Sequence, residues 1–462
     1  MKLVAFLTLG CKVNFYETSG MEKLFLDAGY EVTDFSQRAD VYVINTCTVT
    51  NMADRKSRQM IHRAKKMNPE AIVVAVGCYV QAAKDEVEKD EAIDLVLGNN
   101  QKAKIVEFVE AYLSDTGREP VIVDMKEYTE FEELAIDHIK EKTRAYIKIQ
   151  DGCNQFCSYC IIPYVRGRIR SRNEAEILKE VTLLSERGYQ EVVLTGIHLS
   201  SYGVDLEGIQ DFLVKKGEPL LAIIEKISKI EGIERIRLGS LEPRIITEEF
   251  VQKLRKIEKV CPHFHLSMQS GCDETLKRMN RRYTAEEYFE KCSILRRYYD
   301  FPAITTDVIV GFPSETDDEF NQTKAFVERV AFADLHVFKY SVRKGTRAAN
   351  MEHPVPEQIK TARSEVLLAA QKSAQKAYQS QFIGALQLVL IEEKIDLIDV
   401  NTQEKQAYWV GHTKRYVKVA IPCVSEHEDL SNHMVQVQIK ERHPEGILVG
   451  TPCETSRSLI IK

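Results

Sequence analysis

The sequence has no uninterrupted apolar run of about 18 residues, the length that a membrane-spanning helix needs. Its first residues, MKLVAFLTLGCKVNFYE, hold only a short apolar stretch without a small-residue cleavage site, unlike a secretion signal. Positive charge is not in excess, because 63 Lys and Arg stand against 69 Asp and Glu. These absences predict a cytoplasmic protein without a membrane partner, and they limit any contact with nucleic acid to local patches.

Internal repeats and low-complexity segments are also absent, which excludes a solenoid. Hydrophobic residues make up 44% of the chain, enough for several buried cores, so the chain as a whole is not disordered. A length of 462 residues predicts roughly three domains.

The N-terminal part, residues 1–113, alternates strands with helices. Near-continuous apolar runs at 2–11, 40–47 and 71–78 are typical of parallel strands buried on both faces. Helical patterns follow at Glu17–Ala28 and Asn51–Met67. The predicted fold class is therefore α/β, beginning with a doubly wound parallel domain.

Residues 114–138 have the composition of a linker, with Gly117, Pro120 and an acidic stretch that includes Glu127, Glu130, Glu132 and Glu133. The alternation resumes over 139–370, where six strands predict a partial (β/α)6 barrel with its chemistry at the C-terminal strand ends. Residues 378–450 read as short strands separated by turns, which predicts a small β-barrel. Capping boxes are expected at three helix starts: Asn173 with Glu176, Thr284 with Glu287, and Thr316 with Glu319.

Eleven cysteines are many for a cytoplasmic protein, where disulfides are rare. Cys153, Cys157 and Cys160 form a C-x3-C-x2-C run directly after the first strand of the barrel. Zinc takes four protein ligands, or three and a water, whereas a cubane iron–sulfur cluster normally takes four cysteines. Three thiolates around such a cluster would leave one iron open to a small molecule.

A second set of cysteines is dispersed in the sequence: Cys11, Cys47 and Cys78 each close one of the N-terminal strands. The C-terminal ends of parallel strands meet in one crevice, so three distant thiols are expected to converge there. The alternative is that they are buried small hydrophobic residues. The other five cysteines show no ligand spacing and are expected to be structural: Cys261, Cys272, Cys292, Cys423 and Cys453.

Both cysteine sets, and the segments around them, resemble the radical S-adenosylmethionine (SAM) methylthiotransferases. The resemblance covers essentially the whole chain. It implies an N-terminal methylthiotransferase domain, a radical SAM partial barrel and a C-terminal TRAM barrel. The matching stretches are TLGCKVN, INTCTVT, VGCYVQ, DGCNQFCSYCIIPYVRGRIRSR, LTGIHLSSYG, HLSMQSG, DVIVGFPSET and KYSVRKGTRAA.

Within this family the residues around the first two cysteines separate the branches. Gly10-Cys11-Lys12-Val13-Asn14 and Thr46-Cys47-Thr48-Val49-Thr50 look most like the branch that methylthiolates threonylcarbamoyladenosine just 3′ of the tRNA anticodon. The branch acting on isopentenyladenosine in tRNA usually reads GCQMN there, and the branch acting on a ribosomal protein usually reads GCPKN. Those two substrates remain alternatives, as does an iron–sulfur RNA-binding protein without enzymatic activity.

The resemblance implies two 4Fe–4S clusters and SAM as cofactors. SAM would be cleaved to methionine and a 5′-deoxyadenosyl radical at Cys153, Cys157 and Cys160, and sulfur at Cys11, Cys47 and Cys78 would receive a methyl group from a second SAM. No catalytic acid, base or nucleophile is expected. The implied partners are tRNA carrying threonylcarbamoyladenosine, a flavodoxin- or ferredoxin-like electron donor, and a sulfur donor whose identity the sequence does not give.

Contacts to SAM are expected at the ends of the barrel strands. The family's aromatic residue near the adenine corresponds to Tyr159, and the other predicted SAM contacts are Gly196, Ser240, Glu242 and Gln269. Three histidines, His198, His265 and His336, also lie near strand ends, where a lone histidine is more often structural than functional.

Contacts to RNA are predicted from local basic patches. Four arginines alternate after the C-x3-C-x2-C loop and would point one way if extended, and a basic face follows Cys47 on its helix. In the last domain, aromatic and basic residues interleave, as in small barrels that hold unpaired RNA. The RNA candidates are Arg166, Arg168, Arg170, Arg172, Arg55, Arg58, Arg343, Arg347, Trp409, Lys414 and Arg415.

Overall fold

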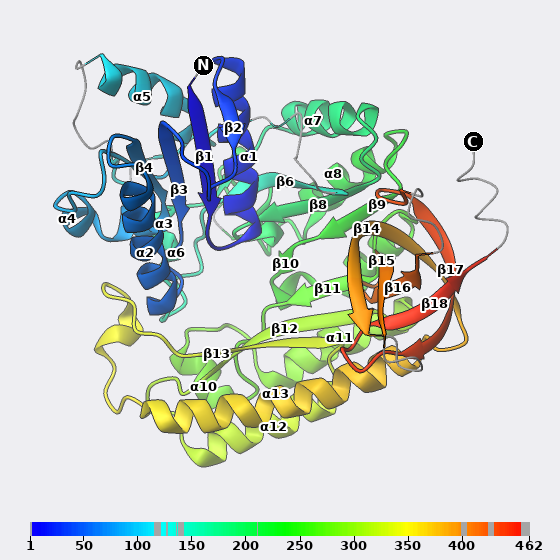
Figure 1. Cartoon of the computed structure of the whole chain (residues 1–462). Helices are drawn as coiled ribbons and strands as arrows, with labels where there is room; N and C mark the ends of the chain where they lie inside the picture. The colour runs from blue at the N-terminus through cyan, green and yellow to red at the C-terminus, as the bar shows by residue number, and fades with distance from the viewer. Residues whose placement is uncertain are drawn as a thin grey trace.

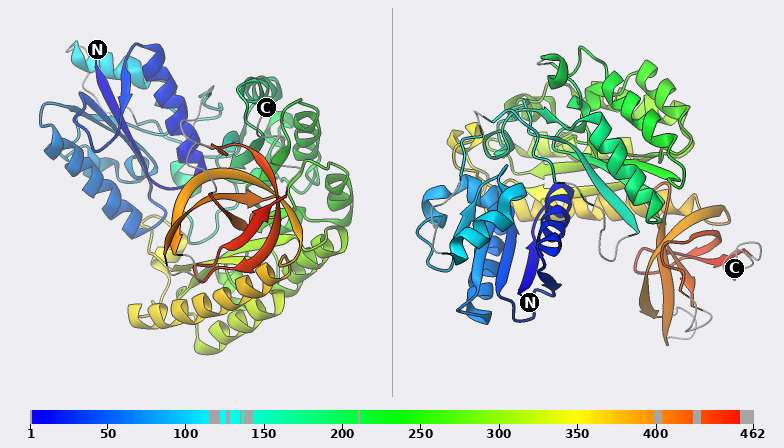
Figure 2. Two further views of the ribbon diagram at one scale, coloured as in Figure 1. Left: turned by 45° about the vertical axis from the view of Figure 1, so that its right-hand side comes forward. Right: turned by 90° about the horizontal axis from the view of Figure 1, so that it is seen from above.

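The computed structural model describes residues 2–114, 122–125, 128–134, 136, 143–209, 211–398, 404–423 and 429–453. Figure 1 shows an N-terminal α/β domain in blue at the left, a central strand–helix layer in green, and a small barrel in orange and red at the right. Both flanking domains lie on the same side of the central layer (Figure 2). No helix in these described ranges is both long and apolar enough to cross a membrane.

The N-terminal domain is a five-stranded parallel sheet in the order β2-β1-β3-β4-β5. This doubly wound order places its switch point between β1 and β3, and ligands of such sheets bind outside the C-terminal strand ends at that point. Strands β3 and β4 are buried along their whole length, as the apolar runs predict. The elements are β1 Leu3–Thr8, α1 Lys12–Asp27, β2 Glu31–Thr33, β3 Val41–Thr46, α2 Asn51–Met67, β4 Ile72–Gly77, α3 Cys78–Ala82, α4 Lys84–Val87, β5 Leu95–Leu97, η1 Lys102–Lys104 and α5 Ile105–Leu113.

The central part contains the six predicted parallel strands and one additional short antiparallel strand, Arg170–Ser171. Because the third parallel strand is divided in two, they form two four-stranded sheets, which a bridge between Ile236 and Val260 joins. The third strand is interrupted at Gly239 into β9 and β10. The elements are β6 Arg144–Asp151, α6 Ile162–Val165, β7 Arg170–Ser171, α7 Glu174–Glu186, β8 Glu191–Gly196, η2 Leu199–Ser201, η3 Asp205–Glu207, α8 Glu218–Ser228, β9 Arg235–Leu238, β10 Ser240–Leu241, η4 Pro243–Ile245, α9 Glu248–Arg255, β11 His263–Leu266, α10 Asp273–Arg278, α11 Ala285–Tyr298, β12 Ala303–Val310, α12 Asp317–Val330, β13 Asp334–Lys339, η5 Arg347–Asn350 and α13 Glu357–Ser380.

Some local predictions differ from the structure. Capping boxes form at Thr284 and Thr316, but Asn173 instead accepts a hydrogen bond from the backbone of Ala175. Helix α1 begins at Lys12, five residues earlier than predicted, and the short edge strand β2 was not predicted. The predicted limit at residue 370 falls inside α13, whose Leu367 packs in the core of the partial barrel.

The described part of the predicted linker packs between the two α/β domains. Leu134 and Ile136 join the core of the partial barrel, and Glu132 accepts a hydrogen bond from the backbone of Ala103 at 3.0 Å. Its acidic stretch is therefore partly an interface; Gly117, Pro120 and Glu127 lie outside the described residues.

The C-terminal domain is a closed barrel in the order β14-β15-β16-β18-β17, as the turn-rich pattern predicts. Buried arginines of β9 join it to the partial barrel. Arg235 donates to the backbone oxygens of His412 and Leu388 at 2.9 and 2.7 Å, and Arg237 donates to that of Lys414 at 3.0 Å. The strands are β14 Leu386–Ile398, β15 Lys405–Thr413, β16 Lys418–Pro422, β17 Met434–Arg442 and β18 Leu448–Pro452.

The buried carboxylate of Glu191 balances these arginines. Arg237 Nε lies 2.7 Å from Glu191 Oε1, and Arg235 and Arg144 lie within 4.0 Å of the same group. Burial alone would raise the pKa of Glu191, but the three guanidinium groups lower it to about 2. The carboxylate is therefore charged at neutral pH.

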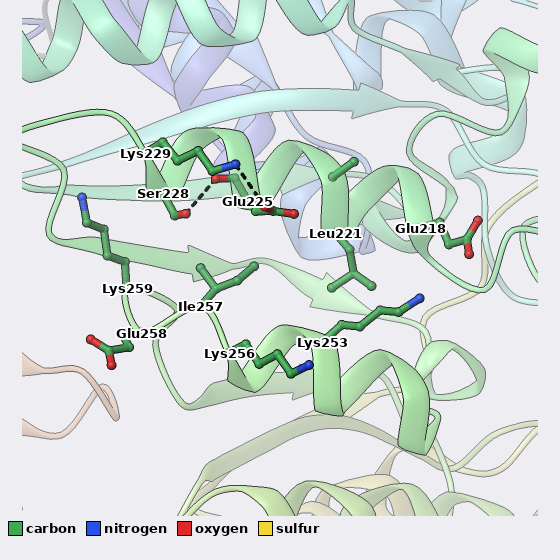
Figure 3. Close-up of a pocket in the computed structure, with 11 residues that line it drawn as sticks. Glu218, Leu221, Glu225, Ser228, Lys229, Lys253, Lys256, Ile257, Glu258 and Lys259 are labelled. Atoms are coloured by element: carbon green, nitrogen blue, oxygen red, sulfur yellow. Dashed lines mark hydrogen bonds and ion pairs between the residues drawn. The ribbon is translucent and has the colours of Figure 1, made fainter.

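A hollow lies on the outer helical face between α8 and α9 (Figure 3). Leu221 and Ile257 line it together with lysines and glutamates, and Lys229 donates to Glu225 at 3.0 Å. No cysteine of either set lines this hollow, and its charges are of both signs.

Replacing Arg237 by methionine is expected to destabilise the protein by about 3–5 kcal/mol, because removing one partner of a buried ion pair leaves the other uncompensated. Trp409, the single tryptophan, is buried in the C-terminal barrel, so its fluorescence during urea unfolding reports this domain. Lys229→Met, which removes an exposed ion pair, is the control and should leave the unfolding midpoint nearly unchanged. Equal midpoints for the two variants would contradict the assignment of Arg237 as an interdomain anchor.

Candidate functional site

The loop that follows β6 holds Cys153, Cys157 and Cys160, all partly buried. Gly152 allows the loop to close, because its φ is +70° and a Cβ there would lie 1.8 Å from the backbone oxygen of Arg168. The backbone of Cys153 donates to Gly167 at 3.0 Å, and Arg281 donates to Cys157 Sγ at 3.4 Å. Burial raises the pKa of the Cys153 thiol to about 12, so a proton must leave when it binds a metal.

The second set lies at the C-terminal edge of the N-terminal sheet: Cys47 and Cys78 directly follow β3 and β4, and Cys11 follows the end of β1 by three residues. Burial raises the pKa of the Cys11 and Cys47 thiols, and the charge of a nearby Cys78 thiolate raises both further. Gly10 is required beside them, since its φ is +106° and a Cβ would lie 2.9 Å from Cys47 Sγ. Topology therefore brings three distant cysteines to the switch point of the sheet.

The distance between the sulfur atoms distinguishes a site for a single metal ion from a site for a cluster. Zinc–sulfur bonds of about 2.3 Å hold tetrahedral thiolates roughly 4 Å apart. Within the described residues, neither cysteine set brings its three sulfurs within 4.8 Å of one another. A multi-iron cluster needs this wider spacing, because its cysteine ligands stand on different irons.

One buried guanidinium, that of Arg166, connects the two cysteine sets. It follows Cys160 by six residues in the sequence, and its Nε donates to Cys78 Sγ at 3.3 Å. Its Nη2 donates to Asn14 Oδ1 at 2.7 Å, the oxygen that also lies 3.8 Å from Cys11 Sγ. The loop of the first set is therefore fixed directly against the second.

A buried ion network surrounds Arg166. Glu17 of α1 lies 2.8 Å from both Arg166 and Lys148 and 3.1 Å from Lys102, and Asp151 lies 2.7 Å from Lys148. Burial by itself would raise the pKa of Glu17, but Arg166, Lys102 and Lys148 hold it well below its usual range. The network joins both α/β domains through charged groups that are all withdrawn from solvent.

Three of the arginines predicted to contact RNA, Arg166, Arg170 and Arg172, are buried and paired within the protein, which opposes that role. Arg166 and Arg170 approach Asp151, and Arg172 pairs with Glu133 and Glu180. Gly167 turns the chain with φ +73° between α6 and β7, so the four arginines do not share one extended face. Only Arg168 of the four is exposed, and its guanidinium lies 4.5 Å from the ring centroid of Phe156.

The other residues predicted to contact RNA also fall into two groups, those engaged within the protein and those that are exposed. Arg343 is buried against Thr48 and Asp54, where it joins β13 to the N-terminal domain. Trp409 packs in the barrel core, while Lys414 and Arg415 donate to backbone oxygens of the central domain. The candidates that are exposed, besides Arg168, are Arg55, Arg58 and Arg347.

Of the predicted SAM contacts, Tyr159 lies within the first cysteine loop and Glu242 is linked to that loop through Arg281. Tyr159 packs 6.4 Å from Phe312, Ser240 is exposed, and Gly196 leaves room for Gln150, whose amide oxygen would lie 2.9 Å from an added Cβ. Gln269 holds a φ of +74°, and its backbone bonds to Asp307 and Ile309 of β12.

Glu242 is not a free acceptor. It is buried and lies 2.9 Å from Arg244 and 3.3 Å from Arg281. Burial opposes these arginines, which nevertheless lower its pKa to about 2. Glu242 therefore orients Arg281 toward Cys157, a contact that no local sequence signal indicated.

Comparisons with known proteins agree with this geometry. A family model described as "Uncharacterized protein family UPF0004" matches residues 3–98, and one described as "Radical SAM superfamily" matches residues 147–327. The solved structure of the radical SAM methyltransferase TsrM from Kitasatospora setae, with cobalamin and a [4Fe-4S] cluster, has a TM-score of 0.56. It is 14% identical and covers 79% of this chain and 84% of that one, so it shows the fold alone.

Among curated relatives, the threonylcarbamoyladenosine tRNA methylthiotransferase MtaB of Bacillus subtilis is 41% identical over 95% of this chain and 94% of its own length. The protein of the same name from Thermotoga maritima is 34% identical over 97% and 96%. The tRNA-2-methylthio-N(6)-dimethylallyladenosine synthase of Acetivibrio thermocellus is 35% identical over 85% and 81%. These similarities extend over most of the chain, which also carries both three-cysteine sets. They show that this chain belongs to the radical SAM methylthiotransferase family.

Proposed function

We propose that this protein methylthiolates carbon 2 of N6-threonylcarbamoyladenosine just 3′ of the tRNA anticodon. The observation that supports this most directly is the pair of three-cysteine sets that Arg166 holds against each other. The relatives with 41% identity bear this activity in their names. The isopentenyladenosine branch, at 34–36%, is the second candidate.

Cys153, Cys157 and Cys160 would hold one 4Fe–4S cluster, and Cys11, Cys47 and Cys78 would hold the other. When bound, these clusters supply the electron that cleaves SAM and the iron site at which sulfur is carried. Carbon 2 of adenine has no acidic proton, so a general base would not activate it and none is required. An electron donor of the flavodoxin or ferredoxin type and a sulfur donor complete the reaction, which we assign to the cytoplasm.

The residues of this chain would tune the two thiolate sets. The guanidinium of Arg166 donates to Cys78 Sγ, and that of Arg281 donates to Cys157 Sγ. Such charge-assisted hydrogen bonds favour the anionic sulfur that binds iron. Because Arg166 also bonds to Asn14 and Glu17, it would fix the distance between the two reaction centres.

The direct test is nucleoside mass spectrometry. tRNA that carries threonylcarbamoyladenosine without a methylthio group is incubated anaerobically with reconstituted protein, reductant, sulfide and SAM. The expected product is heavier by one methylthio group in place of hydrogen. Activity on isopentenyladenosine tRNA instead would replace the proposed substrate by the second candidate, and absence of any product with both clusters intact would refute the proposed function.

Exchanging single cysteines should separate the two half-reactions. Cys157→Ala is expected to abolish release of 5′-deoxyadenosine, whereas Cys47→Ala should retain it and lose methylthio transfer. Each variant should keep about four of eight irons. Cys292→Ala, at a buried cysteine outside both sets, is the control and should keep all the iron. Methylthiolated product from the Cys47 variant would show that the second set is misassigned.

Arg168 is the exposed arginine beside the first cysteine loop, and we expect it to contact a tRNA phosphate. Arg168→Ala should weaken tRNA binding and reduce the slope of log affinity against log salt by roughly one. Arg187→Ala, at the exposed end of α7, serves as the matched control. An unchanged slope in the Arg168 variant would exclude that contact.

A further inference from the structure

Two histidines, His265 and His336, come together on the inner face of the partial barrel, the face opposite to its helices. Their strands, β11 and β13, flank β12 in one sheet (Figure 1). Every second side chain of these strands packs in the core toward the helices, and these core residues include Phe264, Val308 and Leu335. The neighbouring side chains, those of His265, Asp307 and His336, therefore point to the inner face.

The parallel pairing of the strands holds this group in place. Asp307 of β12 is the direct partner of His336 on β13. His265 of β11 is the partner of Thr305, which precedes Asp307 by two residues and so shares its face of the sheet. The three side chains are thus positioned by regular backbone pairing and not by a loop.

The distances within the group are close to those around a single metal ion. Asp307 Oδ1 lies 3.1 Å from His336 Nδ1, and Asp307 Oδ2 lies 3.3 Å from His265 Nε2. Bonds of about 2.0 Å to a tetrahedral ion place two ligand atoms roughly 3.3 Å apart. One ligand atom from each of the three residues lies within 4.8 Å of the others, and His336, with 57% of its side chain exposed, has room to rotate inward.

The carboxylate of Asp307 has no fixed counter-charge. No lysine or arginine lies within 4.0 Å of it in the described part of the chain, and its ion-pair partners are the two imidazoles. Burial would raise the pKa of Asp307, but hydrogen bonds from these imidazoles lower it, so the carboxylate is charged at neutral pH. The hydrogen bond to Asp307 raises the pKa of His336, and the opposing effect of Lys12 is smaller. Negative charge therefore prevails at this group, which favours a cation.

Thr305 orients the first histidine. Its hydroxyl is buried and lies 3.1 Å from His265 Nδ1. When Nδ1–H donates to this hydroxyl, the lone pair of His265 is on Nε2, the nitrogen that faces Asp307. Histidines that bind metals almost always donate the hydrogen of their other ring nitrogen to such a partner, which fixes the tautomer and the ring orientation. Thr305 is therefore the supporting residue that a metal-binding histidine needs.

The group borders two of the predicted SAM contacts. Ser240 on β10 is the direct partner of His265, and the backbone N–H of Gln269 donates to the backbone oxygen of Asp307 at 2.9 Å. The group supplies nitrogen and oxygen ligands, whereas both cysteine sets supply sulfur. It is therefore chemically distinct from them, although it lies on the strands that carry the predicted SAM contacts.

We propose that His265, Asp307 and His336 bind one divalent first-row metal ion of the zinc type, separate from both cysteine sets. Two imidazoles and one carboxylate with further positions open to water are a ligand set of zinc and of non-haem iron(II). The proposal goes beyond the proposed function and does not depend on the RNA substrate.

The experiment uses full-length protein with both clusters intact, so that iron already occupies the cysteines. The protein is incubated anaerobically with Zn²⁺ and desalted, and its zinc and iron are counted by elemental mass spectrometry. Wild type should retain about one zinc per chain. X-ray absorption at the zinc edge should show nitrogen and oxygen ligands at about 2.0–2.1 Å and no sulfur at about 2.3 Å.

Two variants test the assigned ligands. His336→Ala, at the most exposed of the three side chains, should weaken zinc affinity by at least about a hundredfold and leave the iron content unchanged. Thr305→Val, which keeps all three ligands and removes only the orienting hydroxyl, should weaken it roughly tenfold. His62→Ala is the matched control, because His62 lies 2.9 Å from Asp90 without a third ligand, and this variant should bind zinc as wild type does.

Three results would overturn the proposal. They are the absence of retained zinc in wild type with intact clusters, equal zinc affinity in wild type and His336→Ala, and sulfur ligands at the zinc edge. In the first case, Asp307 is only a hydrogen-bond acceptor for the two rings. If His336→Ala also loses iron, the ligands seen at the zinc edge of wild type and the affinity of Thr305→Val decide the outcome.

Discussion

The arrangement of both cysteine sets depends on one buried guanidinium. Arg166 is buried, and its guanidinium donates hydrogen bonds to the Cys78 sulfur, the Asn14 amide oxygen and two carboxylates, those of Glu17 and Asp151. Burying such a charge is costly unless every donor is satisfied. Because its partners come from α1, α3 and β6, all of them must be in place together. The hydrogen bonds and ion pairs of Arg166 therefore fix the N-terminal domain against the partial barrel. The apolar contacts of Tyr16 with the barrel core add to this.

Buried, paired arginines also join the partial barrel to the C-terminal barrel. Arg235 and Arg237 extend to backbone oxygens of the C-terminal barrel while Glu191 neutralises them. Both flanking domains are thus attached to inward-facing charges of the strands.

Both cysteine sets and the strands that carry them could be predicted from the sequence. The spacing of Cys153, Cys157 and Cys160 is local, and the strands that Cys11, Cys47 and Cys78 terminate are continuous apolar runs, so both sets were identifiable. Three of the arginines after Cys160 are buried, although their alternating spacing predicts exposed contacts to phosphate. The alternating pattern does not reveal that Gly167 turns the chain, or that Arg166 finds two of its partners, Glu17 and Asn14, 149 and 152 positions away. The sequence marks Glu242 at a strand end, but nothing in it indicates that Glu242 pairs with Arg281, because only the tertiary structure joins them.

The separation of Glu17 from Arg166 along the chain has a consequence for synthesis. The two residues are 149 positions apart, so a ribosome that adds 5–20 residues per second needs roughly ten to thirty seconds to pass from one to the other. Once residue 102 is made and until residue 148 is added, Lys102 is the one lysine or arginine of this network available to Glu17 among the described residues. The domain is consequently not an interchangeable module, and a graft onto another barrel would need to bring a lysine and an arginine at these two places.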